Sequence, residues 1–343
     1  MTDTEPSSEA RDWRIYTGVG RPHNGIRRLP PPPRWRTFHG EVRAERPLGP
    51  DPNVERRFGA AARGRTFQAA PETIDAVNAA LYLRRPLLVT GKPGAGKSSL
   101  AYAVANELKL GRVLAWSITS RSLLQHGLYQ YDALGRLHEA ELHRDRAPDI
   151  GQYIRLGPLG TALLPSKRPR VLLIDEIDKS DIDLPNDLLN VFEEGAFEIP
   201  ELARLPSELR EVRVRPADNI GPADTVPIVE GRVVCRAFPF VVLTSNGERE
   251  FPPPFLRRCL RLDIQEPQQA ELEKIVEAHL GGEALQSAGT LIGEFLKRRT
   301  RGDLATDQLL NALYLVTREH GPHGGDRDKL LAALWRYLNT ESS

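Results

Sequence analysis

Patterns typical of buried strands and of helices alternate along the middle of the 343-residue chain. Short apolar runs, typical of buried strands, occur at residues 86–90, 112–118, 169–175 and 238–244. Apolar residues at helical spacing predict helices at residues 71–83, 98–108 and 184–194. Because apolar strands that alternate with helices form parallel sheets with both faces covered, we expect an α/β core.

After residue 267 the strand pattern disappears and only helical periodicity remains. Helices are predicted at residues 268–280, 288–298, 306–317 and 327–338. The pattern therefore divides this part of the chain into an α/β domain at residues 61–266 and an α-helical domain at residues 267–343.

Residues 1–60 form an N-terminal extension that is rich in proline and arginine. The proline run at residues 30–33 favours a polyproline II conformation, which has no internal hydrogen bonds. Large apolar residues such as Trp13, Tyr16 and Trp35 are interspersed, and leaving them in water forfeits burial energy. The extension is therefore either a flexible tail or an arm that packs on this core, on a neighbouring subunit or on a partner.

The sequence GKPGAGKS at residues 91–98 follows a predicted strand and opens a predicted helix. In this context the pattern GxxxxGK[ST] indicates a phosphate-binding loop, because its glycines let backbone N–H groups approach the phosphates at a helix N-terminus. We expect Lys97 to reach the β- and γ-phosphates of ATP, and the Ser98 hydroxyl to ligate Mg²⁺. The predicted nucleotide-binding residues of this loop are Gly91, Pro93, Gly94, Ala95, Gly96, Lys97, Ser98 and Ser99.

Two carboxylates follow the most apolar of the predicted strands. Asp175 stands at the strand end, where it would hold Mg²⁺ through water beside the phosphate loop. Glu176 is placed to polarise an attacking water as a general base. We interpret the nearby Asp178, Asp181 and Asp183 as a solvated, helix-capping stretch rather than as further metal ligands.

Polar groups also follow the predicted strand at residues 238–244. Asn246 would orient the attacking water and sense the γ-phosphate from a neighbouring strand end. Arg257 and Arg258 come shortly after it, and an arginine supplied across a subunit interface can neutralise transition-state charge on the γ-phosphate.

In order and spacing, these motifs resemble those of AAA+ ATPases. The elements GPLG at residues 157–160, LIDEIDK at 173–179 and NDLLNVFEE at 186–194 look like the MoxR branch of that family. The resemblance covers residues 65–340. It implies a P-loop NTPase core with a C-terminal helical lid, and a ring, usually hexameric, with ATP at the subunit interfaces.

The same resemblance assigns roles to individual residues. Asn246 would be sensor 1, and Arg258 would be the arginine finger, with Arg257 as a second candidate because the family usually has an acidic residue there. The lid arginine called sensor 2 is expected near Thr306. This chain has no arginine at that position, and Arg301, slightly upstream, is the candidate we keep.

The long segment between the phosphate loop and Asp175 contains Tyr129 and Tyr131. Aromatic residues between glycines can face a ring pore and grip a substrate, but they can equally be packing residues. His126, His138 and His143 suggest a solvated helix face rather than a metal site, because arginines flank them.

Composition narrows the possible functions further. The net charge of +1 gives no global field to attract nucleic acid, and no apolar run approaches the length that spans a bilayer. Cys235 and Cys259 lie far apart in the sequence, so we expect no disulfide framework, and we expect a cytoplasmic location, since the polar N-terminus has no apolar signal region.

The leading functional hypothesis is a MoxR-like ring ATPase that remodels or activates a protein client, together with a partner that carries a von Willebrand factor A domain. Two alternatives stay open: an ATP-driven machine acting on nucleic acid, and an ATP-regulated switch in a bacterial defence or signalling system.

Overall fold

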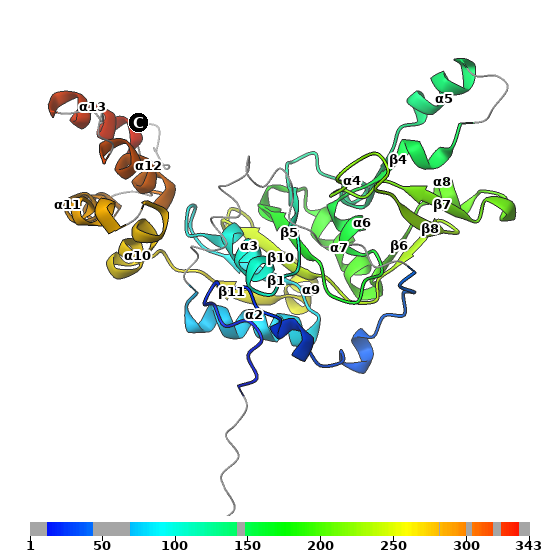
Figure 1. Ribbon diagram of the computed structural model, residues 1–343, viewed down its shortest axis with the longest axis horizontal. Coiled ribbons are helices and arrows are strands. Elements are labelled where there is room, and N and C mark those ends of the chain that lie inside the picture. The colour runs from blue at the N-terminus through cyan, green and yellow to red at the C-terminus, as the bar shows by residue number, and fades with distance from the viewer. Residues whose placement is uncertain are drawn as a thin grey trace, which may run out of the picture.

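A five-stranded parallel sheet lies at the centre of the molecule, in the order β11-β1-β10-β5-β2 (Figure 1). The computed structural model describes residues 12–43, 69–142, 148–280, 282–299, 304–317 and 324–335. The strands are β1 (Leu87–Thr90), β2 (Leu114–Ser117), β5 (Val171–Asp175), β10 (Phe240–Ser245) and β11 (Leu260–Asp263). Four of them lie in the predicted apolar runs, whereas β11 alternates apolar and charged residues and was not predicted.

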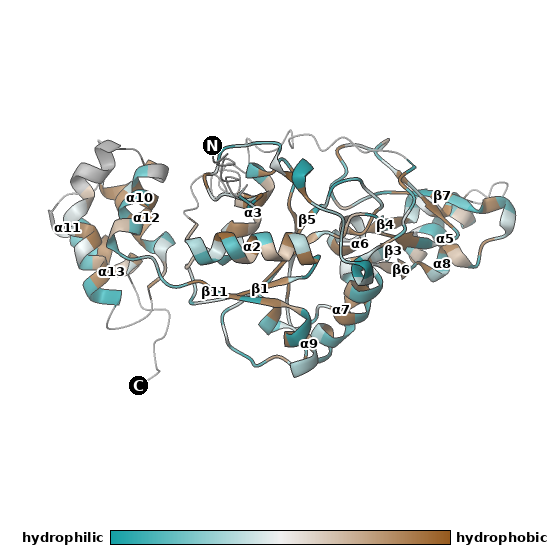
Figure 2. Cartoon of the chain, turned by 90° about the horizontal axis from the view of Figure 1, so that it is seen from below, coloured by the Kyte–Doolittle hydropathy of each residue, from teal (hydrophilic) through white to brown (hydrophobic). Residues whose placement is uncertain are grey.

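Helices cover both faces of this sheet, as the sequence predicts. Alternate residues of a strand point to opposite faces, so Val171 and Leu173 of β5 pack on one side while Leu172 and Ile174 pack on the other. On the first side lie α2 (Pro71–Leu83) and α3 (Lys97–Glu107). On the second side lie α4 (Leu124–Leu128), α6 (Pro158–Ala162), α7 (Asp183–Glu194) and α9 (Pro253–Arg258). Figure 2 shows the resulting apolar interior of the core.

A second group of strands extends one end of the core. The strands β3 (Tyr129–Tyr131) and β4 (Ile154–Leu156) pair with each other, and a four-stranded sheet has the order β6-β9-β8-β7. Its members are β6 (Ala196–Glu198), β7 (Glu211–Val214), β8 (Val226–Val229) and β9 (Arg232–Val234). The sequence analysis did not predict these strands, because each is interrupted by polar or charged residues or a proline and does not form a continuous apolar run.

Shorter helices complete this end of the molecule, in the order α5 (Ala133–Leu142), η4 (Ile150–Tyr153), α8 (Pro200–Ala203) and η6 (Ser207–Leu209), whereas η5 (Ile177–Lys179) follows β5 and contacts β10 of the central sheet. Tyr129 is buried here and its hydroxyl donates to the Glu201 carboxylate at 2.9 Å. Tyr131 is half-buried and packs against the same core, so both tyrosines are packing residues within this chain.

The C-terminal helices form a unit with its own apolar core. They are α10 (Gln269–Leu280), α11 (Gly282–Arg299), α12 (Thr306–Val316) and α13 (Gly324–Leu334). Each overlaps a predicted helix, although α11 begins at residue 282 rather than at the predicted residue 288. Buried side chains such as Phe295, Leu309 and Trp335 hold them together. The structure thus confirms a P-loop type α/β core with a helical lid. In the described part of the chain, each helix is too short or too polar to span a membrane.

Residues 12–43 pack along the core rather than away from it. The segment contains η1 (Gly25–Arg28) and η2 (Arg34–Arg36), and we call it the arm. Its residues Ile15, Tyr16 and Ile26 pack with α2 and α3 on one side of the sheet, whereas Phe38 packs on the other side. The arm therefore wraps around the edge of the core (Figure 1).

Two buried polar side chains fasten the arm. The Asn78 amide accepts from the backbone N–H groups of Ile15 and Tyr16 at 2.7 and 3.0 Å, and it donates to the Tyr16 carbonyl at 2.8 Å. Glu107, which has no exposed surface, accepts from the backbone N–H groups of Thr17, Gly18 and Gly20 and also lies 3.2 Å from the His23 ring. Of the alternatives for the extension, packing on this core therefore holds for the described residues.

Candidate functional site

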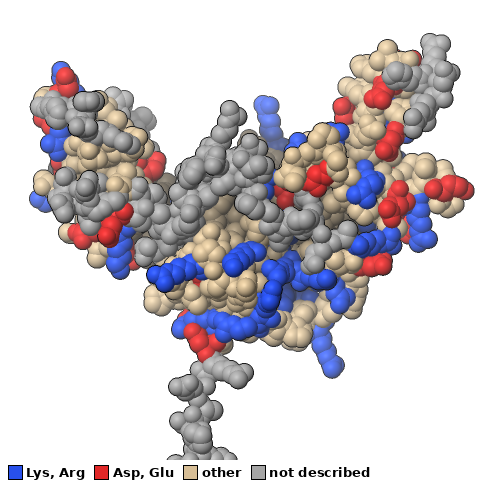
Figure 3. Space-filling model, in the orientation of Figure 1, with Lys and Arg blue, Asp and Glu red and all other residues tan. Residues whose placement is uncertain are grey.

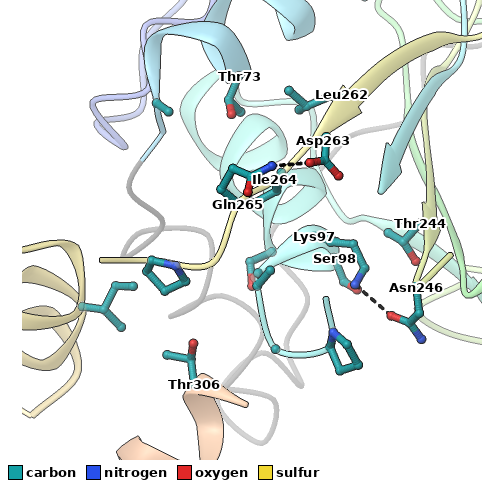
Figure 4. A pocket seen from close by; sticks show the side chains of 18 of the residues that line it. Thr73, Lys97, Ser98, Thr244, Asn246, Leu262, Asp263, Ile264, Gln265 and Thr306 are labelled. Carbon is teal, nitrogen blue, oxygen red and sulfur yellow. Dashed lines mark hydrogen bonds between the residues drawn. The ribbon is translucent and has the colours of Figure 1, made fainter. Parts of the chain in front are cut away.

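One pocket lies at the carboxyl ends of the parallel strands, between the core and the lid (Figure 4). Its volume of about 570 Å³ suits a small organic ligand. The core contributes residues 93–99, Asp175, Glu176, Thr244 and Asn246, and the lid contributes Thr306, Asp307 and Leu310. Thr73, Leu262 and Ile264 add further lining groups. The structure thus brings together most of the residues that the sequence singled out.

The loop between β1 and α3 turns sharply before the helix begins at Lys97. Gly94 and Gly96 have φ angles of 76° and 89°, which favour glycine. Gly94 also lies directly beneath the lid, since a Cβ atom there would come within 2.6 Å of the Ala305 Cβ. The loop is therefore enclosed by the N-terminal end of α12 as well as by the sheet.

Lys97 is buried, and its ammonium group makes three hydrogen bonds, two within this loop and one to the residue that follows β10. It donates to the carbonyls of Gly91 and Lys92 at 2.6 and 2.8 Å, and to Asn246 Oδ1 at 2.8 Å (Figure 4). Burial lowers the pKa of Lys97, and the carboxylates of Asp178, Asp175 and Glu176 oppose that effect. This cation is held at the loop by neutral acceptors that an anionic ligand can replace.

The Asp175 carboxylate accepts hydrogen bonds from two hydroxyl groups. Ser98 Oγ donates to Asp175 Oδ1 at 2.6 Å, and Thr244 Oγ1 donates to the same oxygen at 2.7 Å. The pairing of a carboxylate with a serine hydroxyl suits Mg²⁺, a hard cation that takes oxygen ligands and keeps positions for water and phosphate. The residues present therefore fit the predicted cation.

Thr244 is a site residue that the sequence analysis missed. It is fully buried in β10, lines the pocket, and accepts a hydrogen bond from the Glu176 backbone N–H at 2.8 Å. One hydroxyl thus connects Asp175 with the backbone of Glu176. The available signal was a polar residue within an otherwise apolar buried strand, which needs a hydrogen-bond partner.

Glu176 has an unusual backbone conformation, with φ 60° and ψ 50°. A residue other than glycine costs about 1 kcal/mol or more in this region, so the surrounding contacts must hold it there. Its side chain is 42% exposed at the pocket and forms an ion pair with Lys179 at 2.7 Å. That hydrogen bond raises the pKa of Lys179.

The structure contradicts the interpretation of Asp178 as a solvated residue. It was expected to be solvated, but only 4% of its surface is exposed, because η5 turns it beneath the end of β10. Its Oδ2 atom accepts from the backbone N–H groups of Asn246 and Glu248 at 2.8 and 3.2 Å. Asp178 therefore fixes the turn that carries Asn246, whereas Asp181 and Asp183 are exposed as expected.

The two candidate arginines lie away from this pocket. Arg257 and Arg258 end α9, and neither belongs to the pocket lining. Arg258 Nε pairs with Glu193 Oε1 at 2.9 Å, while the Arg257 carbonyl accepts from Arg85 at 3.3 Å. Arg301 lies outside the described residues, and His143 does too.

Comparison with known proteins agrees with this architecture. The model of the AAA family, the ATPase family associated with various cellular activities, matches residues 87–267, which is more than half of the chain. The matched range contains the phosphate loop, Asp175, Asn246 and both candidate arginines. No curated protein matches the chain. The chain therefore belongs to the AAA family of ATPases.

Proposed function

We propose that the pocket hydrolyses ATP to ADP and phosphate with Mg²⁺ as cofactor. The observation that carries the proposal is the hydrogen-bonded group of Lys97, Ser98, Asp175 and Asn246. This group joins the phosphate loop to the ends of β5 and β10 at the carboxyl edge of the sheet. Loops of this kind bind phosphate through backbone N–H groups and a helix N-terminus. We assign the phosphate-binding backbone N–H groups to Gly91, Gly94, Ala95, Gly96 and Ser99, while Pro93, which has no N–H, lines the same loop.

Each side chain has a chemical task in this proposal. Lys97 exchanges its carbonyl acceptors for β- and γ-phosphate oxygens, while Ser98 and Asp175 hold Mg²⁺, which neutralises charge on the phosphates. Glu176 accepts the proton of the attacking water, and Asn246 orients that water. Because Glu176 is paired with Lys179, it must leave that ion pair to act as the base.

The site is also proposed to need a second copy of the chain. Among the described residues that line the pocket there is no arginine, and Lys97 is the only cation. Phosphoryl transfer gains greatly from an additional positive charge at the γ-phosphate. Arg258, with Arg257 as the second candidate, lies exposed on another part of the surface, as a residue that serves a neighbouring subunit must. This arrangement supports a ring, with a hexamer as the expected form.

For the biological role, we propose a MoxR-like ATPase that remodels or activates a protein client, with a von Willebrand factor A-domain protein as the candidate partner. The support is the sequence resemblance at residues 157–160, 173–179 and 186–194. In a Glu176→Gln variant that retains ATP, client and partner should stay bound and be recovered together. Recovery of single-stranded nucleic acid instead would favour the alternative of a nucleic-acid machine.

Steady-state phosphate release tests the catalytic proposal. Glu176→Gln should bind ATP with near-normal affinity but hydrolyse it about 100-fold more slowly or worse, because it lacks the base. Lys97→Ala should lose most of the affinity, as measured by calorimetry. Wild-type protein that binds ATP tightly without releasing phosphate would reject turnover and favour an ATP-regulated switch.

A further inference from the structure

Arg36, a buried arginine of the arm, contacts Glu193, and Glu193 in turn contacts Arg258, the proposed arginine finger. Only 5% of Arg36 is exposed, and its guanidinium group lies over the Phe238 and Phe38 rings at 4.6 and 5.2 Å. It donates twice to the Arg84 carbonyl, from Nε at 3.1 Å and from Nη2 at 2.7 Å. Because aromatic rings and a carbonyl fix its plane, this guanidinium has little freedom to move.

Glu193 joins Arg36 to Arg258. It lies in the last turn of α7, where its Oε2 atom accepts from Arg36 Nη1 at 3.3 Å and its Oε1 atom accepts from Arg258 Nε at 2.9 Å. One carboxylate therefore lies between two guanidinium groups. The contact is long-range in sequence, since Arg36 and Glu193 are 157 residues apart.

The ion pair with Glu193 leaves the two Nη groups of Arg258 largely available for other hydrogen bonds. Glu193 occupies the Nε side, and Nη1 makes one long contact, at 3.4 Å, with the Pro254 carbonyl. A guanidinium has five N–H donors, so the two Nη groups keep donors for a phosphate oxygen. Glu193 thus aims the side chain without covering the donors that the proposed reaction uses.

An exposed ion pair would not fix Arg258 by itself. Both Glu193 and Arg258 are 44% exposed, and ion pairs between exposed side chains contribute little stability because water and salt screen them. Arg36 changes this balance, because it offers Glu193 a buried and immobile partner. Burial lowers the pKa of Arg36, and the adjacent Glu193 carboxylate opposes that effect, so the ion pair favours the charged form of Arg36.

We infer that Arg36 is a positioning residue for Arg258 and acts through Glu193, so that the arm prepares the arginine that one subunit offers to the next. The inference rests on the proposed function, in which Arg258 completes the pocket of a neighbouring copy. The arm would then help to position the arginine that one subunit provides to the pocket of the next. Figure 3 shows lysine and arginine side chains gathered on the side of the core that carries α2 and the arm.

Mixed rings test this inference, because they separate the subunit that donates an arginine from the subunit that uses it. The donor carries Lys97→Ala, and the acceptor carries Arg258→Ala. Each variant alone should be nearly inactive, whereas a mixture assembled together should regain ATPase activity, because the donor's Arg258 reaches the acceptor's intact pocket.

Arg36→Met is then placed in one kind of subunit at a time. In the donor it should lower the recovered kcat about tenfold with little change in KM, because misplacing a catalytic group slows the chemical step rather than binding. In the acceptor, which lacks Arg258, it should change nothing. Glu193→Gln should reproduce this asymmetry without altering the buried arm. Arg34→Met, an exposed arginine of the same short helix, serves as the matched control.

Three outcomes would overturn the inference. If Arg36→Met lowers the recovered kcat equally in donor and acceptor, Arg36 has only a general structural effect. If Glu193→Gln in the donor leaves the recovered kcat unchanged, Glu193 does not connect Arg36 to Arg258. A mixture that regains no activity before Arg36 is changed would show that Arg258 does not act between subunits. In that last case phosphate release by the wild-type protein would still support the proposed ATPase itself.

Discussion

At the residue scale, the site depends on buried polar groups that hold the exposed ones. Thr244 and Asp178 have almost no exposed surface, and between them they fix the Asp175 carboxylate, the Glu176 backbone and the turn that carries Asn246. A buried polar group is costly when it loses its partner, so such contacts resist displacement. Thr244 and Asp178 thus hold Asp175, Glu176 and Asn246, the residues proposed to bind magnesium and activate water, in position.

We predict that Thr244→Val will slow ATP hydrolysis while the protein stays folded. Valine keeps the shape but removes the hydroxyl, which leaves the Glu176 N–H without an acceptor and Asp175 without one donor. Each lost contact of this kind costs about 1–3 kcal/mol, so kcat should fall at least about tenfold. Steady-state kinetics measure the effect, and Thr244→Ser, which retains the hydroxyl, should recover most of the rate. Equal rates for valine and threonine would contradict this role.

At the element scale, most helices and strands of the core form where local patterns place them, and the arm is held by side chains of α2 and α3. Asn78 and Glu107 supply hydrogen bonds to backbone groups of the arm that no strand or helix satisfies. The arm behaves as part of the core for this reason, despite its proline-rich sequence.

Glu107→Gln should loosen the arm. The amide replaces one acceptor oxygen with an NH₂ group that faces the N–H donors of the arm, and hydrogen bonds to a charged group contribute about 1.5–3 kcal/mol. We expect the free energy of unfolding to fall by about 2–3 kcal/mol in urea titrations. The exposed Glu208→Gln is the control and should change stability by less than about 0.5 kcal/mol. If both variants unfold at the same urea concentration, Glu107 does not stabilise the arm.

At the scale of the whole molecule, several buried ionisable groups remain protonated in the folded state. Burial raises the pKa of both Cys235 and Cys259 to about 12, against ordinary thiol values of 9.0. Burial, together with the hydrogen bond to Glu201, raises the pKa of Tyr129 to about 12 from 10.0. At alkaline pH these three groups therefore bind more protons in the folded chain than in the unfolded chain.

This difference predicts alkaline destabilisation. Where the folded state binds more protons, the free energy of unfolding decreases as the pH rises. The contribution of the thiols is complete below about pH 9 and is lost as the pH rises towards about 12. Urea titrations between about pH 8 and pH 11 should show the decrease, and replacing both cysteines with alanine should make it shallower. A free energy of unfolding that stays constant over this range would exclude the effect.

The sequence by itself determined the parts of the protein that depend on neighbours in the chain. The phosphate loop is a contiguous pattern between a strand and a helix. The long core helices show helical periodicity, and the buried core strands are continuous apolar runs. These features gave the α/β core, the helical lid and the group of Lys97, Ser98, Asp175 and Asn246, because parallel strands bring their carboxyl ends to one edge.

Only the tertiary structure decided the features that join distant segments. It buried Asp178 and Thr244 under the site, paired the short strands β6 to β9, laid the arm on the core and placed Glu193 between Arg36 and Arg258. A local sequence pattern predicts which residues can be buried, but it does not predict which other residues they pack against. Burial and hydrogen-bond partners depend on packing between segments, and that is a property of the folded chain alone.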